Sequence, residues 1–458
     1  MKKHTQSPCE RSEISYKPSS IKWLGEIPQS WEIKKLKYIG EIFGGVTGKT
    51  IKDFSKEYKL NFKPYITFTN VCNNAVINPD LMEYVFIDSK EKQNKVLKND
   101  ILFLQSSETF EDVGKSAIYL NDDEVYLNTF CKGFRIEREA YPMYLNYLLS
   151  SLSYKRYFMS VCSGFTRINL RQEHFLDIPL ILPPLQEQKE IAEFLDKKCE
   201  KIQNYINKKQ KLITLLQEKK QALINEAVCG RVACHTERSE VSTTAYKPSG
   251  IEYLGLIPHH WEVARSGLIY KNISSGTTPQ SDNDEYYKNG NIFWINSGDL
   301  NDSVLTNSKN KITQKAMMAY SALKISPKGS LIIAMYGATI GKVSILGIDA
   351  CTNQACCVLC ESKYLNTRFV FYYFIAKRQD LISMAYGGGQ PNISQDIIKN
   401  FKIPLPLLQE QKQIANFLDE KCEKINSVIE KTKKQIELVK EYKNTFINEA
   451  VCGRIRVN

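Results

Sequence analysis

Residue types that could carry out chemistry occur first at Gly48-Lys49-Thr50, within the segment FGGVTGKT of this 458-residue chain. These three residues end the segment in the way that a phosphate-binding P-loop ends. That motif also requires a glycine at position 43, where this chain has Phe43. A matching stretch later in the chain, Ile273–Gln280, keeps a glycine and has no lysine. The spacing therefore does not predict a nucleotide site.

A second pattern has the letters of a metal-dependent nuclease, because Pro79-Asp80 precedes Asp88-Ser89-Lys90. Metal-assisted cleavage requires carboxylates that gather around the ion. The spacing here is tight, these residue types are common in a lysine-rich chain, and the pattern has no counterpart in the second half. We therefore do not predict a nuclease.

The thirteen cysteines contain one CxxC pair, Cys357 and Cys360. A zinc site would need further ligands, and no second CxxC and no HxxxH follows. The pair lies in an apolar run, which favours a buried strand. The odd number of cysteines in a long chain is typical of reduced thiols. The five histidines form neither a triad nor a metal-binding spacing, so no catalytic residue and no metal ligand is predicted.

Polar loops at matching places remain as candidates for binding. Gly164–Leu170 (GFTRINL) and Gly387–Ile393 (GGGQPNI) lie 223 residues apart, and Gly114-Lys115 matches Gly341-Lys342. Glycine lets a backbone approach its ligand closely, while Arg, Asn and Gln side chains can pair with base edges. The residues that we predict to contact DNA are Ser107, Thr109, Lys115, Thr166, Arg167, Asn169, Arg171, Tyr336, Thr339, Lys342, Gln390 and Asn392.

A duplicated frame must position these loops. Three segments recur: Trp23–Trp31 as Tyr253–Trp261, Leu185–Lys189 as Leu408–Lys412, and Ile224–Arg231 as Ile447–Arg454. Between these markers, the interiors at 34–157 and 264–380 share almost nothing. Internal repetition sets the architecture of a chain. A repeated frame around two unlike interiors predicts a scaffold that recognises two different targets.

Each repeat ends in a predicted long helix. From Gln186 to about Val228 the chain has neither Pro nor Gly, and apolar residues follow a heptad pattern that returns between Ile414 and Ala450. The first stripe contains Ile191, Leu195, Ile202, Ile206, Ile213, Leu216, Leu223 and Ala227. A helix of about 43 residues would be roughly 65 Å long. One apolar stripe requires a partner helix, and we expect the other copy in antiparallel orientation.

Each interior is predicted to be a β-rich globule. The expected strands are 65–68, 100–104 and 116–120 in the first globule, and 291–295, 330–335 and 342–346 in the second. Aromatic-rich helices are expected at 143–158 and 365–375. Together with the long helices, these elements predict an α+β fold.

The charge and hydropathy of the chain restrict its partners and location. A formal charge of +12 and a pI near 8.9 attract polyanions, although solubility alone also accounts for such a charge. No run of about 18 apolar residues exists, and the basic N-terminus lacks the apolar region of a secretory signal. We therefore expect a cytoplasmic protein with no membrane association.

The combination of motifs resembles the specificity (S) subunit of type I restriction–modification systems. The resemblance rests on the Trp23–Trp31 segment, on LPPLQEQKEIAEFLD at 182–196, and on its twin LPLLQEQKQIANFLD at 405–419. MYGATIGKV at 335–343 and NISQDIIKNFKIPLP at 392–406 also fit, so that nearly the whole chain is covered.

The resemblance implies two mixed α/β target-recognition domains, separated by two long helices that form an antiparallel coiled coil, with a pseudo-twofold internal repeat. The implied division is a flexible N-terminus at 1–15, target-recognition domain 1 at 16–183, conserved long helix 1 at 184–232, a linker at 233–245, target-recognition domain 2 at 246–406 and conserved long helix 2 at 407–458. The interiors SSETFEDVGKSAIY and YGATIGKVSIL look like different subtypes of recognition domain.

The resemblance also implies a non-catalytic subunit that reads a bipartite, asymmetric site on double-stranded DNA. Two methylation (M) subunits and the restriction (R) subunits are the expected partners. S-adenosylmethionine, ATP and Mg²⁺ are expected on those partners, and no cofactor or metal on this chain. Two alternatives stay open. The first is a fused type IIG-like restriction–methylation enzyme, although the chain lacks the Asn/Asp-Pro-Pro-Tyr/Phe motif of adenine methyltransferases. The second is a coiled-coil scaffold with no DNA role.

Overall fold

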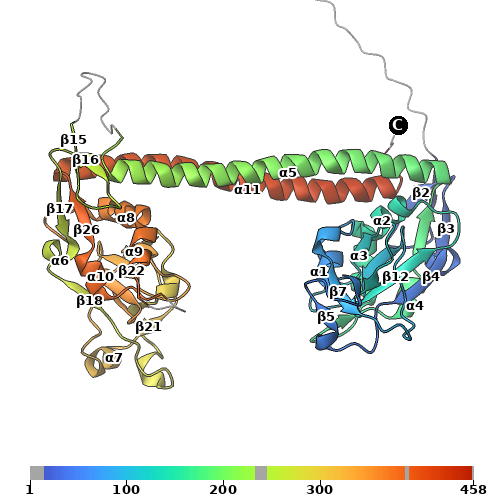
Figure 1. Cartoon of the computed structure of the whole chain (residues 1–458), viewed down its shortest axis with the longest axis horizontal. Coiled ribbons are helices and arrows are strands. Elements are labelled where there is room, and N and C mark those ends of the chain that lie inside the picture. Colours follow the sequence, from blue (N-terminus) through green and yellow to red (C-terminus); the bar gives the residue numbers. More distant parts are fainter. Residues whose placement is uncertain (1–14, 233–244, 387–390, 456–458) are drawn as a thin grey trace, which may run out of the picture. The chain divides into compact units, whose positions relative to one another are not determined.

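The computed structural model describes residues 15–232, 245–386 and 391–455. The chain forms two compact units. Unit 1 comprises Met1–Lys209 with Lys434–Asn458, and unit 2 comprises Gln210–Lys433 (Figure 1). Each unit therefore contains one globule and one half of each long helix. The domain boundaries predicted above follow the sequence repeat and stay a prediction, whereas the units follow contacts in space.

The two long helices are α5 (Leu185–Val228) and α11 (Leu408–Val451), each of 44 residues. Within unit 1, Phe194 near the start of α5 contacts Phe446 near the end of α11, with ring centroids 5.7 Å apart. Within unit 2, Lys220 near the end of α5 donates a hydrogen bond to Asn426 of α11 at 2.9 Å. The helical segments are thus antiparallel in each unit.

The predicted heptad stripes form the apolar side of these helical segments. Ile191 and Leu195 are buried in unit 1, and so are their counterparts Ile414 and Leu418 in unit 2. Every other residue of the two stripes is buried or half-buried. The burial follows from the spacing, because residues three and four apart share one face of a helix.

The globule of unit 1 consists of small sheets around three apolar cores. Its strands are β1 (Tyr16–Pro18), β2 (Glu26–Pro28), β3 (Glu32–Lys35), β4 (Gly40–Gly44), β5 (Phe54–Ser55), β6 (Phe62–Ile66), β7 (Glu83–Phe86), β8 (Ile101–Leu104), β9 (Ser106–Ser107), β10 (Ser116–Ile118), β11 (Tyr126–Leu127), β12 (Cys131–Ile136), β13 (Ile168–Asn169) and β14 (Pro179–Leu182). Its helices are α1 (Phe68–Asn73), α2 (Pro142–Ser150), α3 (Leu152–Val161) and α4 (Gln172–Leu176). The main sheets have the strand orders β10-β8-β12-β4 and β11-β6-β7-β5.

Strand β8 is apolar throughout because both of its faces are covered. Ile101 and Phe103 belong to the core that contains α2 and α3, whereas Leu102 and Leu104 belong to the core that contains Val71 of α1. Successive side chains of a strand point to opposite faces. A continuous apolar run is therefore the expected pattern for a strand between two layers.

Unit 2 repeats this plan with different sheets. Its strands are β15 (Tyr246–Pro248), β16 (Leu256–Pro258), β17 (Glu262–Arg265), β18 (Ile273–Ser275), β19 (Ile292–Ile295), β20 (Val304–Leu305), β21 (Lys311–Ile312), β22 (Leu331–Ala334), β23 (Val343–Leu346), β24 (Ala350–Thr352), β25 (Cys356–Leu359) and β26 (Lys402–Leu405). Its helices are α6 (Ser266–Ile269), α7 (Gln314–Ala319), α8 (Thr367–Ala376), α9 (Arg378–Ser383) and α10 (Gln395–Asn400). The sheet orders include β18-β25-β22-β23-β20 and β21-β19-β24.

The expected strands and helices are present, with two differences. The strand expected at 65–68 ends at Ile66 of β6, and Phe68 begins α1. The region expected as a single helix at 143–158 is broken into α2 and α3. At the break, Ser151 adopts an extended conformation with ψ 160° and ends the first helix. A serine is a poor helix-interior residue because its side chain competes for backbone hydrogen bonds. Helix α8 and strands β8 and β22 lie where the sequence predicted them.

The repeated Leu-Gln-Glu-Gln-Lys segment holds each globule on the start of its long helix. Trp31 donates its indole N–H to Glu187 at 3.2 Å, and Trp261 donates to Glu410 at 3.0 Å. The buried Gln411 donates to the Pro406 carbonyl at 2.9 Å and accepts a hydrogen bond from the Asn366 amide at 2.8 Å. The glutamate and the second glutamine of the motif therefore satisfy polar groups at the base of the globule.

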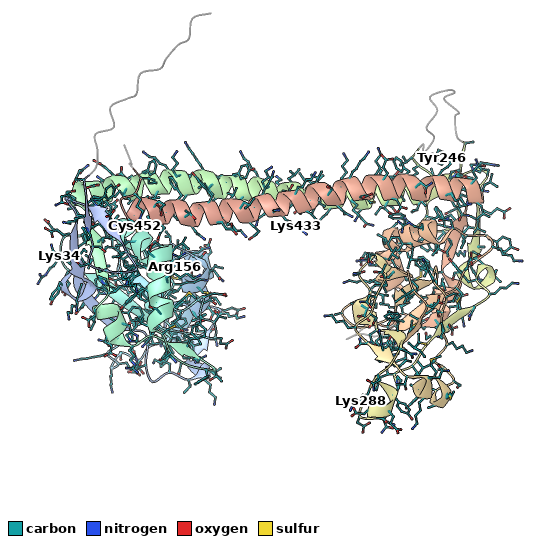
Figure 2. The ribbon with its side chains drawn as sticks, turned by 180° about the vertical axis from the view of Figure 1, so that it is seen from behind. Lys34, Arg156, Tyr246, Lys288, Lys433 and Cys452 are labelled. Atoms are coloured by element: carbon teal, nitrogen blue, oxygen red, sulfur yellow. The ribbon has the colours of Figure 1, made fainter. Side chains whose placement is uncertain are left out.

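The other end of each helix closes a globule as well. In unit 1, the Tyr16 hydroxyl donates to the Gly453 carbonyl at 3.0 Å. In unit 2, the Tyr246 hydroxyl donates to the Gly230 carbonyl at the same distance; Figure 2 labels Tyr246 and Cys452 near these two helix ends. Both glycines have positive φ, 71° at Gly453 and 72° at Gly230. The recurring VCGR sequence is thus a helix end that packs under Trp31 or Trp261.

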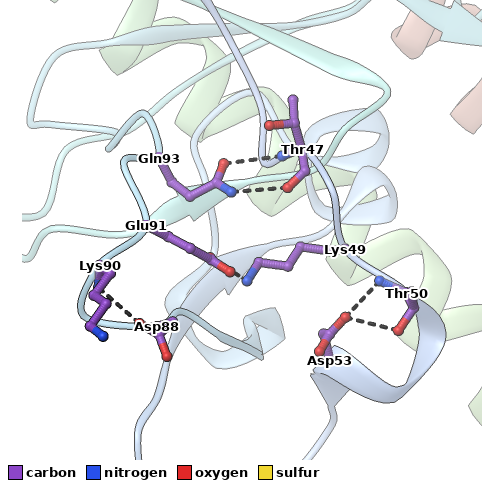
Figure 3. Close-up of polar contacts among 8 residues, drawn as sticks. All are labelled: Thr47, Lys49, Thr50, Asp53, Asp88, Lys90, Glu91 and Gln93. Atoms are coloured by element: carbon purple, nitrogen blue, oxygen red, sulfur yellow. Dashed lines mark hydrogen bonds and ion pairs between the residues drawn. The ribbon is translucent and has the colours of Figure 1, made fainter.

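The glycine-rich segment after β4 has a structural role (Figure 3). The Lys49 side chain is only 4% exposed and forms an ion pair with Glu91. Thr47 and Gln93 exchange two hydrogen bonds of 3.1 and 2.9 Å between backbone and amide groups. A Cβ atom on Gly45 would lie 2.0 Å from the Asn128 carbonyl oxygen. Glycine here permits close backbone packing, and the lysine joins two loops.

We expect Gly453→Ala to lower the free energy of unfolding by about 2–4 kcal/mol, because a left-handed backbone and overpacking both disfavour a Cβ there. That Cβ would lie 2.5 Å from Pro28 and 3.0 Å from Trp31. Gly48→Ala is the matched control, since Gly48 has φ 69° and open space around it. Urea unfolding should show a loss of only about 1–2 kcal/mol for the control. Equal losses would contradict a packing role for Gly453.

We expect Lys49→Met to destabilise the chain by about 1–2 kcal/mol, because Glu91 keeps its charge and loses its partner. The double variant Lys49→Met/Glu91→Gln should recover most of that loss. Lys98→Met is the control, since Lys98 and its partner Asp122 are 50% and 85% exposed. Its effect on the urea midpoint should be small. No recovery in the double variant would contradict a role for the Lys49–Glu91 ion pair.

Candidate nucleic-acid interface

In unit 1, three segments that are distant in the chain meet at the end of β8. The Gln105 amide donates to the Phe130 carbonyl at 3.0 Å, and the Leu170 amide donates to the Gln105 carbonyl at 2.9 Å. Strand β13 pairs with β9, so that Ile168 lies opposite Ser107 and Asn169 opposite Ser106. The two loops that the sequence singled out are therefore neighbours in space.

The loop 163–169 is closed by its own hydrogen bonds. Ser163 and Asn169 exchange two backbone hydrogen bonds of 3.2 and 2.8 Å, and the Asn169 side chain donates to the Arg167 carbonyl at 3.0 Å. Gly164 has φ 138°, and a Cβ on it would lie 1.9 Å from the Arg167 carbonyl oxygen. Only glycine fits this geometry. The loop exposes Phe165, Thr166 and Arg167 at its tip.

The neighbouring turn is organised around Asp112. Its carboxylate accepts a hydrogen bond from the Thr109 hydroxyl at 2.8 Å and forms an ion pair with Lys115 at 2.6 Å. The Lys115 ammonium and then the Thr109 hydroxyl hold the pKa of Asp112 below its ordinary value, against the effect of burial. The half-buried Lys115 also contacts Cys72 at 3.6 Å. These contacts hold the turn at residues 109–115 in place.

The predicted contact residues of unit 1 thus divide into two groups. Thr109, Thr166, Arg167, Asn169 and Arg171 are exposed, and Arg171 pairs with Glu173 at 3.2 Å. Ser107 is only 4% exposed and its hydroxyl accepts a hydrogen bond from the Thr109 amide at 3.3 Å, so that it shapes the turn. Lys115 lines a cavity of about 150 Å³ beside α1. A role of Ser107 or Lys115 in contacting DNA stays a prediction.

Unit 2 has the same backbone arrangement. The Ile393 amide donates to the Met335 carbonyl at 2.8 Å, and Tyr386 pairs with Asn392 as Ser163 pairs with Asn169. Tyr336, Thr339 and Lys342 are half-buried and Asn392 is exposed. Gln390, which the sequence also singled out, lies outside the described residues.

The two turns before these loops match in the same way. Gly114 donates to Leu104 and Gly341 donates to Ala334, both at 2.8 Å. The side chains on this shared backbone differ. Ala355 accepts the same kind of hydrogen bond as Phe130, from Met335 at 2.8 Å, yet it has no ring. One hydrogen-bonded frame therefore presents two chemically different surfaces.

Sequence reasoning missed two residues of this interface. Asp112 organises the 106–115 turn, and Phe130 lies under the guanidinium of Arg167, whose Cζ atom is 4.2 Å from the ring centroid. Three elements, β12, α2 and α3, separate Phe130 from Arg167 in the chain, and no spacing rule connects the two residues. Comparison of Phe130 with Ala355 across the repeat is the one signal that could have pointed to it.

The other chemical candidates of the sequence do not assemble into a site. Asp88 accepts a hydrogen bond from the Lys90 amide at 2.9 Å within a turn (Figure 3). Cys357 lies in β25 within the core, where burial raises its pKa to about 12. Among the described residues, no group of three His, Cys, Asp or Glu side chains could hold a metal ion. No helix in this described part is long and apolar enough to cross a membrane.

Comparisons with known proteins agree over nearly the whole chain. The putative type I restriction enzyme MjaX specificity subunit of Methanocaldococcus jannaschii is 28% identical over 95% of this chain and 96% of its own length. The type I restriction enzyme StySPI specificity subunit of Salmonella potsdam is 24% identical over 94% of this chain and 90% of its own.

Solved structures show a similar fold. The HsdS subunit from Thermoanaerobacter tengcongensis has a TM-score of 0.52 at 17% identity, covering 94% of this chain and 98% of that chain. A chain from a structure of a type I R-M system has a TM-score of 0.69 at 16% identity, covering 94% and 99%. A family profile matches residues 28–217 and 258–438. The chain therefore belongs to the family of the type I restriction modification DNA specificity domain, of which it has two copies.

Proposed function

We propose that this chain is the DNA specificity subunit of a type I restriction–modification complex. Unit 1 reads one half of a bipartite site and unit 2 reads the other. One observation carries this proposal: the same backbone hydrogen bonds hold loops of different composition in the two units. Membership of a DNA specificity family supports DNA as the target of these loops. Two unlike surfaces on one frame fit an asymmetric site.

Binding follows from two kinds of contact. Basic side chains attract the duplex and hold its phosphates, and the net charge of +12 supports this part. The exposed polar side chains of the loops read base edges in the major groove, where each base pair presents a distinct pattern of donors and acceptors. The predicted residues that have the exposure this role needs are Thr109, Thr166, Arg167, Asn169, Arg171 and Asn392.

The chemistry is supplied by partners in this proposal. Two methylation subunits bind the two copies of the frame, hold S-adenosylmethionine and flip the adenine that they modify. Restriction subunits with ATP and Mg²⁺ join them. The chain itself has no catalytic role and holds no cofactor or metal. The matched helix ends at Gly453 and Gly230 support a repeated docking surface, because the same hydrogen bond from a tyrosine hydroxyl to a glycine carbonyl recurs in both units.

The two 44-residue helices set the distance between the recognition loops in this proposal. The expected spacer between half-sites is around one DNA turn or less, about 34 Å or roughly 10 base pairs. A continuous helix without Pro or Gly is stiff enough to fix such a distance.

Exchange of residues 34–180 for the corresponding segment of another family member should change one half of the methylated motif and leave the other half intact. The reason is that this segment contains every recognition loop of unit 1, while the frame at Trp31 and Glu187 stays in place. Methylation sequencing of cells that express the chain with its methylation subunit measures the motif. A change in both halves, or in neither, would overturn the modular proposal.

Deletion of one heptad from each long helix should shorten the spacer by about 3 base pairs, because seven residues span about 10.5 Å of helix and one base pair spans about 3.4 Å. The half-site sequences should stay the same. The same methylation sequencing gives the spacer directly. Deletion of two residues from each helix is the control, since at about 100° per residue it turns the apolar stripe by about 200° and should abolish assembly. An unchanged spacer in a heptad variant that still methylates DNA would rule out the helices as the ruler.

A further inference from the structure

We propose that Arg167 reads a guanine in the half-site of unit 1, and that Phe130 is the platform that orients it. This inference rests on the proposed function, because it assigns one base to one residue of the same interface.

The Arg167 side chain is exposed, and its guanidinium stacks on the Phe130 ring with 4.2 Å from Cζ to the ring centroid. Within the described residues, its guanidinium forms no hydrogen bond and no ion pair, and Arg167 is engaged only through its ring contact and its carbonyl. Arg135 in the same globule is paired, by contrast, with Asp100 at 2.7 Å. Stacking occupies one face of the guanidinium and leaves the N–H donors at its edge available.

The platform is held rigidly by its backbone. The Phe130 amide donates to the Asn128 side chain at 2.9 Å, and the Phe130 carbonyl accepts from the amides of Gln105 and Ser106 at 3.0 and 3.2 Å. The adjacent Thr129 hydroxyl donates to the Val46 carbonyl at 2.8 Å. The ring itself is 41% exposed. A fixed aromatic surface at the protein boundary lowers the entropy that an arginine loses when it binds.

The loop that carries Arg167 is equally constrained. Asn169 holds the Arg167 carbonyl, and the close approach of Gly164 to that carbonyl admits no Cβ. Phe165, two residues earlier, is fully exposed at the tip of the same loop. The pair offers one planar cation and one apolar contact to the same ligand.

Among DNA groups, guanine fits this arrangement best. Its O6 and N7 atoms are adjacent acceptors in the major groove, and a guanidinium edge pairs with both. A phosphate can pair with the same guanidinium edge. A side chain held in one plane by an aromatic ring is better suited to the fixed plane of a base, and the experiment below separates the two targets. Phe165 would then contact a neighbouring base, such as the methyl group of a thymine. In unit 2, Ala355 occupies the position of Phe130 and offers no ring, so this device is confined to unit 1.

Selection of randomised duplex DNA by the purified full-length chain tests the inference. The wild-type chain should enrich a bipartite motif with a guanine in the half that the exchange of residues 34–180 assigns to unit 1. Arg167→Lys keeps the charge and loses the planar fork, so discrimination for that guanine should fall by roughly 10- to 100-fold. Phe130→Leu should weaken the same position by a smaller factor.

Arg138→Ala is the matched control, because Arg138 is exposed and lies beyond the opposite end of β12 from Phe130. It should leave the guanine preference unchanged. A unit 1 half-site without guanine would overturn the inference. Uniform weakening of all sequences by Arg167→Lys, with the preference retained, would also overturn it and would indicate a phosphate contact. If the wild-type chain enriched no motif at all, the proposed function itself would fail, which separates the two outcomes.

Discussion

The packing of a helix end against a tryptophan is the constraint on which the rest of this structure depends. Gly453 and Gly230 turn the last residues of the long helices under Trp31 and Trp261, and their positive φ leaves no room for a side chain. The same tryptophans donate to Glu187 and Glu410 at the start of the opposite helix. Each globule is thereby fixed to both helices. These tryptophan contacts therefore determine where the recognition loops lie relative to the helix ends of the same unit.

In this interface the backbone hydrogen bonds are the same in both units, whereas the exposed side chains differ. Backbone amides and carbonyls of both units pair in the same order around Gly114 and Gly341. Backbone hydrogen bonds are indifferent to side-chain identity, so the exposed residues can change without loss of the frame. Arg167 on its ring in unit 1, with Ala355 at the corresponding place in unit 2, is one such difference. Specificity can therefore diverge while stability stays with the repeated segments.

Local periodicity explains how much of the fold the sequence predicts. The heptad spacing anticipated both long helices and the burial of Ile191 and Ile414, and apolar runs anticipated β8 and β22. The break of a predicted helix at Ser151 was missed, because helical patterning continues on both sides of it. The convergence of Phe130 with Arg167 could not be predicted, since it depends on the pairing of β9 with β13 and not on spacing along the chain. The loops themselves were found because the repeat aligned them.

The hydrogen bond from Tyr16 to Gly453 joins residues 437 positions apart, whereas Tyr246 and Gly230 are separated by 16. During synthesis, the frame of unit 2 can close its tyrosine joint as soon as residue 246 leaves the ribosome. The corresponding hydrogen bond of unit 1 can form only after the last turn of α11 has been synthesised, although the globule of unit 1 is synthesised first. Such long-range closure is slow and comes late in folding. A nascent chain that stops before Gly453 therefore lacks the Tyr16–Gly453 hydrogen bond of unit 1. Both recognition units have their tyrosine–glycine hydrogen bond only after α11 has been synthesised.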